Sequence, residues 1–438
     1  MPDLRRELSL FDATTINVGT MIASAIFIVP STVALQLRLP ALAILVWVVG
    51  GLVSLLGALC MAELGAAFPQ AGGLFVYLRE GFGPVWGFLY GWAVAALVNP
   101  ASIAAIAAAF ATYLGFFVPL GPWGVKLVAV GSIAALTALN CAGVREGAVT
   151  QNVLTTLKVA ALVGLVLAAF ALPGGSVAHL TAGAAPAGGL LAPLGVAMVA
   201  VLWAYDGWIE ITYVGSEVVD PGRVLPKSIA WSLAVVIAVY TLANVAFLYV
   251  LPPDRMAASA LVASDVATVV LGSGGAAVVA ACILVATLGA NNGIVLTSAR
   301  IPYAMARDGR FFPWAGRVHP TLGTPVPALL AQGLVAAALA LTGTYEELFT
   351  YVVFASWVFY ALGCAAVLRL RRTKPDLPRP YRAWGYPVTP LVFIGFAAWL
   401  VGSAIVETPR EAAVGVIIVA AGLPGYWYWS RAARPSAA

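Results

Sequence analysis

Long apolar runs without a charged residue dominate this 438-residue chain. No charged residue stands between Glu80 and Lys126 or between Lys227 and Asp254, and Leu39–Ala62 is another such run. A helix that crosses a bilayer needs roughly 20 apolar residues, so each run holds one or two spans. The runs lack the strict apolar–polar alternation of outer-membrane strands. The pattern therefore predicts a polytopic bundle of membrane-spanning helices.

Composition sharpens this prediction. Apolar residues make up 62% of the chain and charged residues 9%, whereas soluble domains carry about 25% charged residues. We expect an all-α protein of the inner (plasma) membrane with twelve spans. The spans lie at roughly 9–35, 40–66, 84–116, 124–141, 150–171, 190–217, 227–251, 268–305, 325–343, 346–369, 387–406 and 411–430.

Lys and Arg are distributed unevenly between the predicted loops. With the N-terminus placed inside, 18 of the 23 Lys and Arg residues fall on the cytoplasmic side, four fall outside, and Lys158 lies within a span. This bias follows the positive-inside rule and predicts an even number of spans with both termini cytoplasmic. The basic pI of 9.0 therefore reflects membrane topology, and no nucleic-acid partner is expected.

The first predicted span contains a cluster of small residues in its middle. Gly19, Ala23, Ser24 and Ala25 stand close together in an otherwise apolar helix, and Pro30 comes soon after. One interpretation is a face for close packing against another helix. The other is a helix in two parts, whose free amides and positive dipole end face an anion. Both interpretations stay open on this segment alone.

The sixth predicted span holds two carboxylates near its middle. Asp206 and Glu210 stand with two Trp and one Tyr around Gly207. Intramembrane carboxylates are costly and mark functional sites, and free carbonyls at a helix break suit a substrate ammonium group. Interrupted helices at equivalent places in two halves of a chain are typical of the central site of a transporter.

Lys158 is the one basic residue inside a predicted span. Its side chain either snorkels to the cytoplasmic surface or points inward. In the second case, we expect its ammonium group to bond the broken first helix and hydroxyls such as those of Thr297 and Ser298. An ammonium group fixed beside the broken helix would take the place of a bound sodium ion, which argues against sodium coupling. A role of Lys158 in proton coupling stays open.

Four segments are similar, in chain order, to the motifs of one transporter family. They are Gly19–Phe27, Glu63–Tyr77, Trp203–Trp208 and Gly289–Pro327. On these motifs the chain resembles the amino acid–polyamine–organocation superfamily, and within it the L-type amino acid transporter family. The resemblance implies one transporter domain with a LeuT-like fold of two inverted five-helix repeats, at 9–171 and 190–369. Two additional helices follow at 387–430, and the first and sixth helices are discontinuous.

The same resemblance assigns roles to residues at the two breaks. The substrate-binding residues are Met21, Ala23, Ser24, Ala25, Trp203, Asp206 and Asn292. The backbone of the first break would hold the substrate carboxylate, and carbonyls near Met21, Trp203 and Asp206 would hold its ammonium group. The residues that gate or couple transport are Lys158, Trp203, Ser298 and Tyr240. Trp203 would close over the substrate from outside, whereas Tyr240 either has a family role or packs against a neighbour.

Three departures from the family pattern bear on substrate and partners. Ala23 and Ala25 replace glycines, so their methyl groups narrow the space near the substrate α-carbon and favour small or unusual substrates. Asp206 adds a carboxylate that selects cations or protons, or else is neutralised by a neighbour. Animal members join a heavy chain through a cysteine in an outer loop. The corresponding loop, Phe116–Lys126, contains none, so no disulfide-linked heavy chain is expected.

These observations predict a transporter rather than an enzyme or a channel. We expect alternating-access, sodium-independent exchange of neutral L-amino acids, with proton-coupled uptake of an amino acid or small amine as the alternative. No filter loop or charged pore ring indicates a channel, and two loop histidines without catalytic spacing indicate no enzyme. The four scattered cysteines predict neither a metal site nor a cofactor. We expect a monomer or a weak homo-oligomer in the lipid bilayer.

Overall fold

Helices account for all regular structure in the part of the chain that is described. The computed structural model describes residues 3–183, 189–343, 345–407 and 409–432. Within these residues no β-strand forms, and an isolated parallel bridge joins Leu8 to Val218. Eight described helices are long and apolar enough to cross a membrane, or nine when one bent pair counts as a span. The chain is therefore a multi-pass helical membrane protein.

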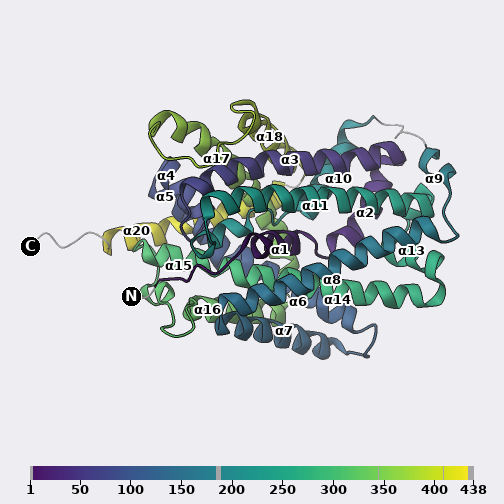
Figure 1. Cartoon of the computed structure of the whole chain (residues 1–438), viewed down its shortest axis with the longest axis horizontal. Coiled ribbons are helices and arrows are strands. Elements are labelled where there is room, and N and C mark those ends of the chain that lie inside the picture. Colours follow the sequence, from purple (N-terminus) through teal and green to yellow (C-terminus); the bar gives the residue numbers. More distant parts are fainter. Residues whose placement is uncertain (1–2, 184–188, 344, 408, 433–438) are drawn as a thin grey trace, which may run out of the picture.

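Twenty α-helices and four other helical segments follow one another along the described chain (Figure 1). The first half contains α1 (Leu10–Met21), α2 (Ala25–Leu37), α3 (Pro40–Ala67), α4 (Leu74–Phe82), α5 (Pro84–Ala93), η1 (Val94–Val98), α6 (Asn99–Leu114), α7 (Pro122–Ala142), α8 (Val144–Ala171) and α9 (Val177–Thr181). The second half contains α10 (Leu191–Tyr205), η2 (Glu210–Glu217), α11 (Pro221–Val250), α12 (Pro253–Ala257), α13 (Val262–Leu271), η3 (Gly272–Gly274), α14 (Gly275–Ser298), α15 (Arg300–Arg307), η4 (Pro313–Gly316), α16 (Val326–Thr342), α17 (Tyr345–Thr373), α18 (Val388–Glu407), α19 (Pro409–Ala420) and α20 (Gly422–Ala432). Segment η1 is π-helical, and η2, η3 and η4 are 3-10 helices.

The long helices run nearly parallel, and α1 lies in the middle of the bundle (Figure 1). Helix α3 packs along α11, and α14 packs against both α6 and α8. The central α1 contacts α8, α11 and α14. Trp47 of α3 and Trp208, just after α10, are fully buried in this interior, where their rings remove a large apolar area from contact with the solvent. The short α1 is therefore held on several sides, which allows its backbone to end inside the bundle.

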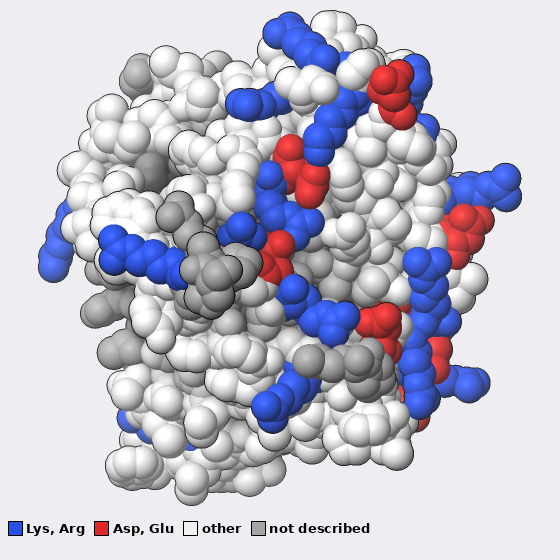
Figure 2. Space-filling model, turned by 90° about the vertical axis from the view of Figure 1, so that its left-hand side faces the viewer, with Lys and Arg blue, Asp and Glu red and all other residues white. Residues whose placement is uncertain are grey.

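One end of the bundle is rich in charged side chains. The first described residues and α20 lie at this end (Figure 1), and Lys, Arg, Asp and Glu gather on its face (Figure 2). Arg79 pairs with Asp308 at 2.7 Å, and Lys374 pairs with Glu80 at 2.7 Å. Burial disfavours the charged form of Glu80, but Lys374 and Arg79 outweigh this effect and lower the pKa of the carboxyl group.

A deeper ion pair closes the bundle between this charged face and its centre. Arg300, at the start of α15, donates to both carboxylate oxygens of Glu217 at 2.7 and 2.8 Å, and both side chains are fully buried. The backbone amides of Glu7 and Leu8 each donate to the Glu217 carbonyl oxygen at 2.9 Å. The N-terminal segment, the end of η2 and the start of α15 are therefore fastened to one another.

Candidate functional site

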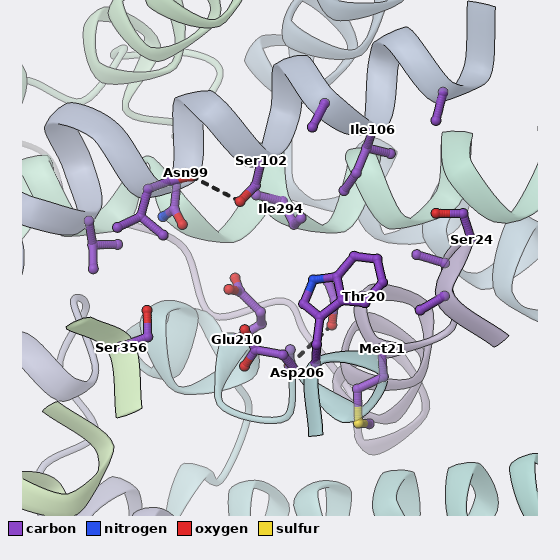
Figure 3. A pocket seen from close by; sticks show the side chains of 18 of the residues that line it. Thr20, Met21, Ser24, Asn99, Ser102, Ile106, Asp206, Glu210, Ile294 and Ser356 are labelled. Atoms are coloured by element: carbon purple, nitrogen blue, oxygen red, sulfur yellow. Dashed lines mark hydrogen bonds between the residues drawn. The ribbon is translucent and has the colours of Figure 1, made fainter. Parts of the chain in front are cut away.

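A cavity of about 680 Å³ lies in the middle of the bundle. Residues of α1, α2, the α5–α6 region, α10 with η2, α14 and α17 line it (Figure 3). It continues past small and apolar residues of α6 as far as the exposed Thr112. The loop after α6 lies at the end of the bundle opposite the charged face (Figure 1). The cavity therefore extends toward the end that lacks the buried ion pair.

Helix α1 ends on one wall of this cavity. It stops at Met21, α2 starts at Ala25, and the two helices are bent by 46°. Between them Ile22 is extended, and the amides of Ser24, Ala25 and Ile26 donate to no other group in the described part of the chain. These donors stand at the positive end of the α2 dipole, a place that favours an anion. The prediction of a helix in two parts is confirmed.

The second interruption faces the first. Helix α10 ends just before Asp206, which is extended. Gly207 has a φ of +110°, a conformation that favours glycine, and a Cβ there would lie 3.1 Å from the backbone nitrogen of Met21. The hydroxyl of Thr20 donates to the Gly207 carbonyl oxygen at 3.2 Å. The break predicted around Gly207 is confirmed, and the two breaks are in direct contact.

Two buried side chains tie the breaks together. Asn17 of α1 donates to the Trp208 carbonyl oxygen at 3.1 Å and accepts from an amide of η2 at 2.9 Å. The hydroxyl of Tyr240 lies 2.8 Å from the Met21 carbonyl oxygen and 3.2 Å from that of Ala204. Irregular backbone at membrane depth persists where protein groups serve it in this way. Asn17 is absent from the predicted site, although a polar amide inside a span is a signal for it.

Lys158 is 2% exposed and lies behind the first break rather than on the cavity wall. Its Nζ donates to the carbonyl oxygens of Gly19, Ile22 and Ala286, each at 2.8 Å. An ammonium group has three donors, so all three are used. The side chain therefore points inward and holds the end of α1, as predicted, and it does not snorkel to the surface.

The predicted contacts of Lys158 with two hydroxyls are wrong. The Thr297 hydroxyl donates to the Glu210 carboxylate, and the Ser298 hydroxyl donates to a side chain of α16 at 2.7 Å. Lys158 meets α14 at Ala286, eleven residues before Thr297. Eleven residues of helix span about 16 Å, which is beyond the reach of one lysine.

Asn292 lies on α14, as predicted, but it does not line the cavity. Its Oδ1 accepts from Asn140 of α7 at 2.9 Å, and its Nδ2 donates to Gln151 of α8 at 2.8 Å. Polar side chains of this kind hold neighbouring membrane helices together. Asn292 therefore joins three helices and does not face the cavity, contrary to its assignment to the substrate.

The other residues predicted to bind substrate come together around the cavity. They are Met21, Ala23, Ser24, Ala25, Trp203 and Asp206. Ser24 points toward the cavity, whereas the side chain of Met21 points away from it (Figure 3). Met21 therefore offers its backbone to the cavity. Ser298 and Tyr240, which are predicted to gate or couple transport, are not among the residues that line the cavity, and neither is Lys158.

Two carboxyl groups, from Asp206 and Glu210, point into the cavity (Figure 3). Tyr360 of α17 donates to Asp206 Oδ1 at 3.0 Å. Tyr90 and Tyr213 also line the cavity, and their hydroxyls lie 2.5 Å apart. No Lys, Arg or His is among the residues that line the cavity as the structure describes it. The cavity thus offers amide donors at one break and carbonyl and carboxyl oxygens at the other.

Comparison with known proteins connects this geometry to a family. The family model for amino acid permeases matches residues 8–423. The chain is 33% identical to the large neutral amino acids transporter small subunit 2 of Oryctolagus cuniculus, over 97% of this chain and 81% of that protein. It is 30% identical to the serine/threonine exchanger SteT of Bacillus subtilis, over 97% of both chains. It is also 30% identical to the b(0,+)-type amino acid transporter 1 of Mus musculus, over 97% of this chain and 88% of that protein. The chain belongs to the amino acid permease family of membrane transporters, and it is not an enzyme.

Proposed function

We propose that this permease exchanges neutral L-amino acids across the inner (plasma) membrane by alternating access and without sodium. The observation that carries the proposal is the direct contact of two helix breaks on one cavity. Free amides of Ser24 and Ala25 lie at the first break, and Asp206 lies at the second. A zwitterion needs donors for its carboxylate and acceptors for its ammonium group, and these breaks supply both. The names of similar proteins, which include transporters of neutral amino acids and an exchanger, support the substrate class.

In this proposal the substrate carboxylate binds the amides at the start of α2. Its ammonium group binds carbonyl oxygens at the end of α10, with Asp206 beside them. Trp203, at the end of α10, lines the same cavity and would close over the substrate from outside. In this pose the methyl groups of Ala23 and Ala25 lie close to the α-carbon of the substrate. Amino acids with little bulk at the α-carbon therefore fit best.

Alternating access is supported by the difference between the two ends of the cavity. One end continues along α6 to Thr112, and the other is closed by the buried pair of Arg300 and Glu217. In the proposed orientation the open end of the cavity faces outside, and we infer that the inward-open state requires the Arg300–Glu217 pair to move. Lys158 supplies a fixed cation behind the first break, so we propose that no sodium ion is needed there.

We also propose twelve spans in a LeuT-like arrangement of two inverted repeats, with both termini cytoplasmic. The face rich in Lys and Arg, at the end that carries α20, supports this orientation. We propose no disulfide-linked heavy chain, because the loop Phe116–Lys126 has no cysteine. The protein then acts alone in the bilayer, as a monomer or a weak homo-oligomer.

The proposal is tested by uptake of labelled L-leucine into proteoliposomes. We expect rapid uptake into vesicles preloaded with an unlabelled neutral amino acid, little uptake into empty vesicles, and the same rates with sodium or choline outside. Accumulation in empty vesicles under an imposed proton gradient would contradict exchange and support proton-coupled uptake of an amino acid or small amine instead. Protein-free liposomes give the background.

A further inference from the structure

A second cavity, of about 230 Å³, lies among α2, α8, α13 and α14, which pack side by side (Figure 1). It shares no described lining residue with the cavity at the two breaks. The segments that line it are candidate membrane spans: the bent pair that contains α2, Val144–Ala171 and Val262–Arg307. Its described lining carries no charge and no hydroxyl group, and Cys282 is its most polar side chain. Water needs several polar partners to stay in a cavity, so this one is suited to an apolar occupant.

Small residues on α8 leave this space open. Ala161, Gly164 and Ala168 stand at spacings of three and four residues, so they lie on one face of the helix. A Cβ on Gly164 would have no neighbouring atom of the described chain within 4 Å. Small residues in membrane helices usually allow close contact with another helix, but here the neighbouring helices leave a hollow. Protein interiors contain few voids larger than a water molecule, so a hollow of this size favours a ligand that fills it.

The second cavity is lined by lipid-facing residues on one side and by a buried ring on the other. Leu271 and Val278 are 41% and 49% exposed, whereas Phe27 of α2 is 1% exposed. Exposed apolar side chains of a membrane span face the hydrocarbon of the bilayer. A buried apolar cavity of about 150 Å³ can bind benzene, so this larger one has room for part of a hydrocarbon chain. The bilayer is therefore the source from which this cavity is filled.

Two helices that hold the first break also form this cavity. Phe27 lies in the first turn of α2, and its amide donates to the Ser24 carbonyl oxygen at 3.1 Å. On α8, Ala161 comes about one turn after Lys158, which donates to the Ile22 carbonyl oxygen. An occupant of the cavity therefore packs against both α2 and α8 beside the break.

We propose that this cavity binds an acyl chain of a membrane phospholipid. The chain enters past Leu271 and Val278, lies against Gly164 and ends at Phe27. It supplies contacts that the small residues of α8 do not make, and it supports α2 beside the first break. The site is separate from the substrate cavity, so it does not depend on which amino acid the permease exchanges.

Photocrosslinking of the full-length protein in liposomes tests this site. The probe is a phosphatidylcholine with a diazirine near the end of one acyl chain, and mass spectrometry of peptides locates its adducts. We expect adducts on α8 and α14 at the cavity to exceed those on the lipid-facing side of α7 by about 5-fold or more, because a bound chain stays longer than one that only surrounds the protein. Gly164→Leu places a side chain in the hollow and should reduce the adducts at the cavity by about 5-fold or more.

Gly131→Leu is the matched control. Gly131 is an exposed glycine within the spanning helix α7, a Cβ there would also have no neighbouring atom of the described chain within 4 Å, and the residue does not line the cavity. This variant should leave the adducts at the cavity unchanged.

Equal adducts on α7 and at the cavity in the wild-type protein would overturn the proposal, because the phospholipid then only surrounds the bundle. Adducts at the cavity that do not decrease in Gly164→Leu would overturn it as well. If Gly164→Leu does not fold, Ala168→Leu takes its place, since Ala168 lines the cavity on the same face of α8. The comparison of α7 with the cavity needs no variant and decides by itself.

Discussion

The two helix breaks at the centre of this permease are built in different ways. The first, between Met21 and Ala25, carries small and apolar residues and offers backbone amides. The second, around Gly207, carries two carboxyl groups and follows the carbonyl end of α10. One break therefore presents the start of a helix and the other the end of a helix to a single cavity. The opposite dipole ends suit the opposite charges of an amino acid.

The two breaks also differ in what holds them. The second depends on its own glycine, whose φ is +110°. The first depends on side chains from distant parts of the chain, because Lys158 and Tyr240 bind its carbonyl oxygens. Substitutions at these three positions should therefore disturb transport by separate routes, although all of them act on one site.

Lys158→Met should have the largest effect. It removes the donor from three buried carbonyl oxygens, and each unsatisfied group costs about 1–3 kcal/mol. We expect leucine exchange to fall by about 100-fold or more and the Tm to decrease. The control is Lys126→Met, since Lys126 lies near the start of α7 and donates to a single carbonyl oxygen, that of Leu341 in α16. Similar exchange rates in the two variants would show that the first break does not depend on the hydrogen bonds of Lys158.

Gly207→Ala should have the next largest effect. The new Cβ meets the backbone of α1 at 3.1 Å, and the positive φ adds about 1–3 kcal/mol of strain. We expect exchange below about one tenth of wild type, measured as the initial rate of counterflow. Gly309→Ala also places an alanine at a positive φ, of +73°, but its Cβ would have no other atom within 4 Å. If both variants lose the same activity, contact between the breaks is not what matters.

Tyr240→Phe should have a smaller effect. It removes the hydroxyl that lies near the carbonyl oxygens of Met21 and Ala204, and one hydrogen bond contributes about 0.5–1.5 kcal/mol. We expect a loss of about 2- to 10-fold in the apparent affinity for leucine. Tyr249→Phe, on the same helix, removes a hydroxyl without a hydrogen bond in the described chain and should leave affinity unchanged. An unchanged affinity in Tyr240→Phe would assign Tyr240 to packing.

Replacing Ala23 and Ala25 by glycine should have the smallest effect on leucine, within about 3-fold. The change removes two methyl groups from the cavity wall, and glycine adds up to about 1 kcal/mol of backbone cost at the start of α2. We expect amino acids with a bulkier α-substituent, such as α-methyl-leucine, to gain relative to leucine in competition. A substrate range identical to that of wild type would show that these methyl groups do not limit the site.

Both breaks leave local signals in the sequence, and the resemblance to the transporter family turns these signals into a prediction of two discontinuous helices. Small residues around Ser24 and a glycine between aromatic residues at Gly207 mark them, and a lone lysine in a span marks Lys158. The partners across the cavity could not be predicted in this way. Whether Asn292 faces a substrate or another helix depends on how α14 is rotated and where it crosses its neighbours.

The same limit explains the other differences. Thr297 and Ser298 are adjacent in sequence, yet they pair with η2 and α16, on different sides of α14. Tyr360 and Asn99 join the cavity from α17 and from the start of α6, far from either motif. Hydrophobic periodicity locates a helix and its buried face, but it does not fix which residues of two helices meet.

The most direct test of the two-break site compares L-leucine with L-leucinamide as inhibitors of leucine exchange. Leucinamide keeps the ammonium group and the side chain but lacks the carboxylate that the amides of Ser24 and Ala25 would bind. If the site is as proposed, half-inhibition by leucinamide requires a concentration at least about 100-fold higher than by leucine, because charged hydrogen bonds are lost. Equal inhibition by the two compounds would contradict the assignment of the substrate carboxylate to the first break.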